Sequence, residues 1–104
     1  MEITVIQTID RMRLANRQEL LTLLATAITE MTISARAHYD VDDSVSHLRQ
    51  TNEAIHRLAG HLRDLCDPNE TLSESRAAGI GGQFTLLPPS AITRILNSAN
   101  TNPH

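Results

Sequence analysis

The stretch from Val41 to Cys66 reads VDDSVSHLRQTNEAIHRLAGHLRDLC and decides the fold. Apolar or small side chains recur along it at alternating spacings of four and three, which predicts an amphipathic helix with one buried seam. One seam residue, Asn52, is polar: it either fixes the register and the number of packed helices, or lies at the edge of the seam and binds water. The predicted seam is Val41, Val45, Leu48, Asn52, Ile55, Ala59, Leu62 and Cys66.

A second amphipathic stretch precedes this one and is predicted to be helical over residues 4–36. Its apolar stripe includes Leu24, Ile28 and Met31, but the apolar residues before Asn16 lie on a rotated face. Asn16, followed three positions later by Glu19, is typical of a helix cap, so the helix is either bent near Asn16 or divided there. With the next helix at 42–66, stopped by the proline at 68, the pattern predicts a long antiparallel helical hairpin.

Residues 70–104 are predicted to form a separate C-terminal segment. The glycines at 79–82 indicate a flexible break, Pro89 is well placed to open a short helix over about 89–97, and residues 99–104 are expected to be disordered. The apolar stretch 84–96 either covers the hairpin or binds a protein partner. The hairpin of residues 1–69 is expected to fold without this segment.

The small size of the predicted core suggests self-association. The chain has 104 residues and only two aromatic side chains, and a lone hairpin rarely buries enough surface to be stable. The fold class is therefore predicted as all-α, a hairpin that forms a homodimer with the architecture of an antiparallel four-helix bundle. The predicted interface is Leu24, Ile28, Met31, Val45, Leu48, Asn52, Ile55, Ala59 and Leu62.

Composition also bounds the compartment and the partners. The formal net charge of −3 gives no field that would hold a nucleic acid or an anionic membrane, although all nine basic residues are arginine. No secretory signal is evident, and no run approaches the roughly 18 apolar residues of a membrane span. The single cysteine, Cys66, is expected to be buried in the seam of a protein in a reducing compartment. These features predict a cytoplasmic location.

The sequence HRLAG at residues 56–60 lies on the outer side of the 42–66 helix. It resembles the active-site helix of histidine phosphotransfer domains, whose pattern is His-x-Leu-Lys-Gly. The resemblance implies an exposed His56 that carries a phosphoryl group and a small Gly60 that lets a receiver domain approach. Arg49 and Arg63, seven residues to either side, would favour the phosphoryl group. The resemblance covers five residues, and Ala59 replaces the family's lysine.

A metal site is not predicted, although one pattern suggests the possibility. Glu53 and His56 form the Glu-x-x-His pair of di-iron four-helix bundles, to which Glu19 or Glu30 would add carboxylates. With Ile55 on the buried seam, however, Glu53 points away from the core, so the ligands do not converge. No cofactor and no catalytic nucleophile are predicted either.

The predicted function is protein–protein interaction without catalysis, as a small regulatory, adaptor or chaperone-like protein. Phosphotransfer through His56 is the alternative, and a metal-binding bundle is the second alternative.

Overall fold

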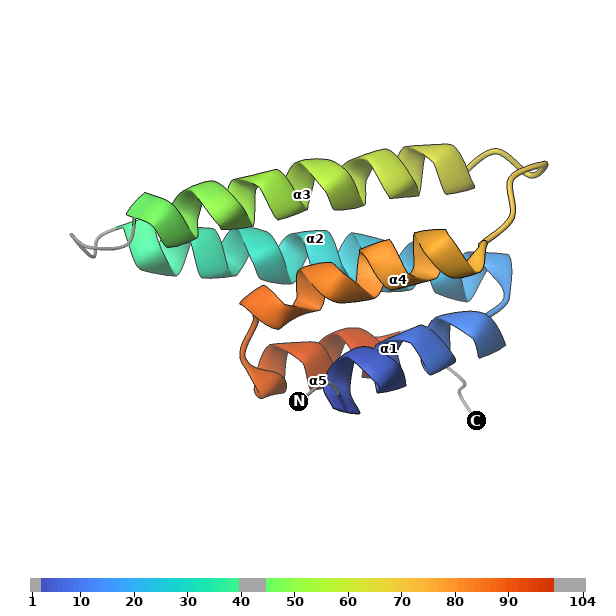
Figure 1. The fold of residues 1–104 in the computed structure, drawn as a ribbon, viewed down its shortest axis with the longest axis horizontal. Coiled ribbons are helices and arrows are strands. Elements are labelled where there is room, and N and C mark those ends of the chain that lie inside the picture. The colour runs from blue at the N-terminus through green and yellow to red at the C-terminus, as the bar shows by residue number, and fades with distance from the viewer. Residues whose placement is uncertain (1–2, 40–44, 99–104) are drawn as a thin grey trace.

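The computed structural model describes residues 3–39 and 45–98, and all regular structure within them is helical (Figure 1). The all-α prediction is confirmed for this part of the chain. Val41, predicted in the seam, and the tail at 99–104 lie outside the described residues. The elements are α1 (Ile3–Leu14), α2 (Arg17–Tyr39), α3 (Val45–Leu65), α4 (Glu74–Gln83), the short 3-10 helix η1 (Phe84–Leu86) and α5 (Pro89–Ser98).

The predicted helix 4–36 is two helices that separate at Asn16. The side chain of Asn16 accepts a hydrogen bond from the backbone N–H of Glu19 at 2.8 Å. In return the Glu19 carboxylate accepts from the backbone N–H of Asn16 at 3.0 Å. This reciprocal capping box satisfies two donors at the start of α2 and lets the chain change direction. Of the two sequence alternatives, division at Asn16 is the one observed.

The long hairpin consists of α2 and α3, which run antiparallel over most of the molecule's length (Figure 1). By length and composition alone, the part of α2 from Arg17 to Ala37 could cross a membrane, and it is the one described helix that passes this test. In this fold the apolar face of α2 packs into the core, and that packing accounts for the apolar composition of the helix. The residues of this face are Leu20, Leu23, Leu24, Ala27 and Met31, all buried within the chain.

The expected flexible break at residues 79–82 is wrong, because these residues belong to α4. Each glycine inside a helix costs roughly 1 kcal/mol relative to alanine, so this segment has little tendency to form a helix by itself. The Ser73 hydroxyl caps its first turn by accepting from the backbone N–H of Arg76 at 3.0 Å. Ala77, Ile80 and Phe84 are buried against the other helices, and this packing supplies what the local sequence lacks.

The short C-terminal helix predicted at about 89–97 is observed as α5. Pro89 occupies its first position, where a missing backbone N–H costs nothing. Arg94 anchors α5 to α2 by donating two hydrogen bonds, at 2.9 and 2.8 Å, to the two carboxylate oxygens of Glu30. These bonds hold the pKa of Glu30 below its ordinary value, with burial opposing them.

One core unites all five helices, so residues 70–98 are not a separate appendage. Seven of its sixteen described buried residues come from α4, η1, α5 and Leu87, which lies between η1 and α5. The chain thus supplies for itself the covering that the hairpin was expected to take from a second copy. That reason for a homodimer no longer applies, and the homodimer stays a prediction. The seven residues are Ala77, Ile80, Phe84, Leu87, Ala91, Ile92 and Ile95.

Candidate functional site

The buried side of α3 lies one position away from the predicted seam. Its buried residues are Thr51, Ala54, Leu58 and Leu65, whereas Asn52 is exposed. The buried polar residue is therefore Thr51, whose hydroxyl donates to the backbone carbonyl of its own helix at His47, 2.8 Å away. The physical reason is that α3 packs against both α2 and α4, so its buried side points between them.

The predicted interface residues divide into three groups. Leu24 and Met31 are fully buried within the single chain and are not available to a partner. Val45, Asn52 and Ala59 are exposed, and Val45 retains 66% of its accessible surface. The remaining four are partly buried: Ile28, Leu48, Ile55 and Leu62.

Cys66 is exposed, which corrects the expectation that it is a buried seam residue. It lies just beyond the end of α3, where its backbone N–H bonds to the carbonyls of Leu62 and Arg63. Cys66 was expected to be buried because it follows Leu62 by four residues, the spacing of one helical face. That spacing no longer applies at Cys66, because α3 ends at Leu65.

The segment 84–96 covers the core. Phe84, Leu87, Ala91, Ile92 and Ile95 are all buried. These five side chains therefore take the covering role, one of the two predicted for this segment, and binding of a protein partner by the segment stays a prediction.

The partly buried aliphatic residues of α2 and α3 share one side of the hairpin. Polar α3 residues such as Asp64 face α4, and Glu30 of α2 faces α5, so the opposite flanks of both helices point away from those neighbours. Arg17, whose guanidinium donates to the carbonyl of Leu65, fixes the antiparallel register at one end. We call this surface the open face; it consists of Leu21, Ala25, Ile28, Leu48, Asn52, Ile55, Ala59 and Leu62.

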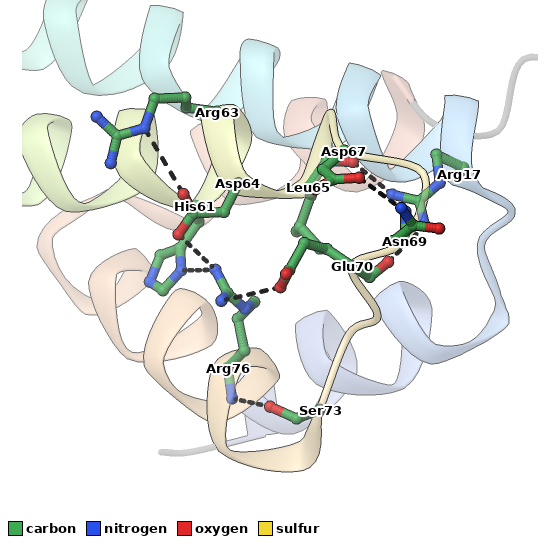
Figure 2. Close-up of polar contacts among 10 residues, drawn as sticks. All are labelled: Arg17, His61, Arg63, Asp64, Leu65, Asp67, Asn69, Glu70, Ser73 and Arg76. Carbon is green, nitrogen blue, oxygen red and sulfur yellow. Dashed lines mark hydrogen bonds and ion pairs between the residues drawn. The ribbon is translucent and has the colours of Figure 1, made fainter.

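On the other side of α3, Arg76 joins α3 to α4 (Figure 2). Its guanidinium lies 3.3 Å from the Asp64 carboxylate, 3.2 Å from Nδ1 of His61 and 3.7 Å from the Glu70 carboxylate. Arg17 holds the loop between the two helices by donating to three backbone carbonyls, those of Leu65, Pro68 and Glu70. These two arginines fix the angle at which α4 meets the hairpin. No pattern in the sequence pointed to this junction.

A polar hollow of about 480 Å³ lies beside this junction. Both signs of charge line it, and Arg76 already binds the carboxylates of Asp64 and Glu70, so this arginine holds the helices together. Gly60 faces open space in this hollow, since a Cβ there would meet nothing within 4 Å. The lining residues are Arg57, Gly60, His61, Asp64, Ser73, Ser75 and Arg76.

The junction predicts a pH-dependent stability. Burial lowers the pKa of His61, the adjacent Arg76 lowers it further, and Asp64 opposes both. Above the ordinary histidine pKa of about 6.5 the imidazole is neutral in both states. As the pH falls through that value, the unfolded chain binds the proton before the folded chain does. The free energy of unfolding is therefore expected to fall with pH below about 6.5, until the pH passes the lowered pKa.

Urea denaturation at about pH 7.5 and about pH 5, on either side of the ordinary histidine pKa, measures this effect. His61→Gln should flatten the pH dependence, since glutamine does not titrate. His56→Gln, on the exposed side of the same helix, is the matched control and should leave the dependence unchanged. Equal slopes for wild type and His61→Gln would show that the junction does not sense pH.

The residues of the phosphotransfer resemblance are not all on the outer side of α3, because Leu58 is fully buried and Gly60 lines the hollow beside α4. His56 is exposed, and Arg49 and Arg63 are exposed seven residues to either side of it. Phosphotransfer stays a prediction.

Among the described residues no group of three or more His, Cys, Asp or Glu could hold a metal ion. Glu19 caps α2 and Glu30 binds Arg94, so both carboxylates considered for a metal site are engaged elsewhere.

Comparisons with protein-family models, with curated proteins and with solved structures found no match.

Proposed function

We propose that this protein acts through protein–protein interaction, as a small regulatory, adaptor or chaperone-like factor, and that its open face binds an α-helical segment of the partner. The observation that carries the proposal is the run of partly buried aliphatic side chains along α2 and α3. Leu21 and Ile28 on one helix, and Leu48, Ile55 and Leu62 on the other, each keep part of their surface in water. A packed helix would remove that surface at roughly 25 cal/mol per Å².

A helix suits this surface because two adjacent antiparallel helices present parallel rows of side chains. A third helix fits its own ridges between such rows at a shallow crossing angle. Small residues on each side, Ala25 and Ala59, allow close approach. A second copy of the chain that presented its own open face would complete a four-helix bundle, and the homodimer is one form of this proposal.

The test is site-specific photocrosslinking in the cells that make the protein. A photoreactive amino acid at Ala59 is expected to give a discrete adduct, identified by mass spectrometry. The matched control is Ala78, an exposed alanine on α4. An adduct with the chain itself would establish the homodimer. If Ala59 gives no more adduct than Ala78, the open face does not bind a protein.

A further inference from the structure

The open face is bordered by positive charge. Arg36 of α2 and Arg49 and Arg63 of α3 are exposed, and helical spacing places them on the rows next to the apolar side chains. Neither Arg36 nor Arg49 has an ion-pair partner among the described residues. Arg63, whose side chain is 82% exposed, has only a 3.6 Å contact with its sequence neighbour Asp64. Within the described residues, these three arginines therefore present positive charge along this border.

The described carboxylates of the same two helices are directed elsewhere. Glu19 caps the first turn of α2, Glu30 binds Arg94 of α5, and Asp64 binds Arg76 of α4. The fourth, Glu53, lies on α3 one row further from the open face. A chain with a net charge of −3 thus presents an apolar strip whose border is positive.

From this separation of charge we infer that the partner helix is amphipathic and acidic, with aliphatic residues facing the open face and Asp or Glu on both flanks. The inference rests on the proposed function and adds the chemistry of the partner. Arg49 and Arg63 are 14 residues apart, or about 21 Å along a helix, so the partner needs acidic residues over about four turns. Arginine's planar donors suit carboxylates on such flanks.

The same charges disfavour a second copy as the occupant. A second copy would bring the same three arginines to the interface, and the described part of its open face would bring no carboxylate to meet them. Like charges placed opposite each other weaken an interface. Complementary charge favours a different, acidic chain.

An anionic membrane is the other surface that positive charge could meet. Helices that bind membranes insert protruding Trp, Phe or Leu side chains and carry many Lys or Arg residues. The open face has no aromatic residue, and its leucines and isoleucines are partly buried between the two helices. Three arginines and no lysine give weak attraction to lipid. The geometry therefore favours a protein helix.

The experiment is selection from a displayed library of helical peptides of about 18 residues, long enough to span both arginines. The facing positions carry aliphatic residues, and the flanks are randomised between Glu, Gln and Lys. Wild type is expected to enrich Glu over Lys on the flanks. Arg36→Glu/Arg49→Glu/Arg63→Glu should reverse that preference. Arg57→Glu is the matched control, because Arg57 is also exposed on α3 but faces the α4 side.

A selected peptide should then bind the triple variant roughly tenfold more weakly, since each exposed ion pair contributes a modest factor, and added salt should weaken its binding to wild type. Selected peptides without acidic enrichment would overturn the charge inference and leave the proposed function standing. No selected peptide, or peptides that still bind Ala59→Glu, would overturn both. Flotation with phosphatidylserine vesicles, or a sedimenting dimer that Ala59→Glu dissociates, would identify a membrane or a second copy as the occupant instead.

Discussion

Ending the chain at Asn69 is expected to leave an unfolded polypeptide, although the long hairpin remains in the fragment. The truncation removes seven of the sixteen core residues. Removing one large buried side chain typically costs about 2–5 kcal/mol, and the whole stability of a domain is about 5–15 kcal/mol. The summed cost of losing Ile80, Phe84, Ile92 and Ile95 is therefore larger than the free energy of unfolding of a typical domain. Far-UV circular dichroism should show little helix and no cooperative thermal transition.

The matched control ends the chain after Ser98, the last residue of α5. This variant keeps every core residue and should retain the circular dichroism and the transition of the full chain. A fragment of residues 1–69 that is helical and melts cooperatively as a monomer would contradict the single shared core. The same fragment folding only as a dimer would show that a second copy can replace α4 and α5.

Phe84→Ala is expected to lower the free energy of unfolding by about 3–5 kcal/mol, the usual cost of deleting a buried phenylalanine. Phe84 is fully buried where α4 passes into η1, and it is the one phenylalanine in the chain. Its ring belongs to the core shared by the helices, so alanine leaves a cavity there. Urea denaturation monitored by circular dichroism measures the loss.

Leu14→Ala is the control for this substitution. Leu14 is also a large apolar residue, but it remains 81% exposed at the end of α1, so its loss should change stability by no more than about 0.5 kcal/mol. Equal effects of the two substitutions would contradict the described position of Phe84 in the core.

The open face could be found only in part from the sequence. The 41–66 pattern correctly singled out Ile55 and Leu62 as apolar positions on one side of a helix. It could not say how far they are buried, because that depends on how many neighbours α3 has. The border of arginines had a usable signal, since Arg36 and Arg49 fall next to the apolar rows in a helical projection. The sequence could not show that the carboxylates of Glu19, Glu30 and Asp64, described on the same two helices, bind elsewhere.

The junction between α3 and α4 had no comparable signal. Arg76 lies 12 residues from Asp64 and 15 from His61 in the sequence. It belongs to α4, whose glycines made a helix unexpected there. Contacts at such separations follow from where α4 packs, which local patterns do not encode.

By itself the sequence determined the helical class, the hairpin, the cap at Asn16 and the start of α5 at Pro89. Each depends on spacing or capping within a few residues, where backbone geometry leaves few alternatives. The tertiary structure alone decided that α4 is a helix, that Thr51 is buried in place of Asn52, and that Cys66 is exposed. These outcomes depend on burial against distant segments, because the free energy of packing outweighs local preferences of about 1 kcal/mol.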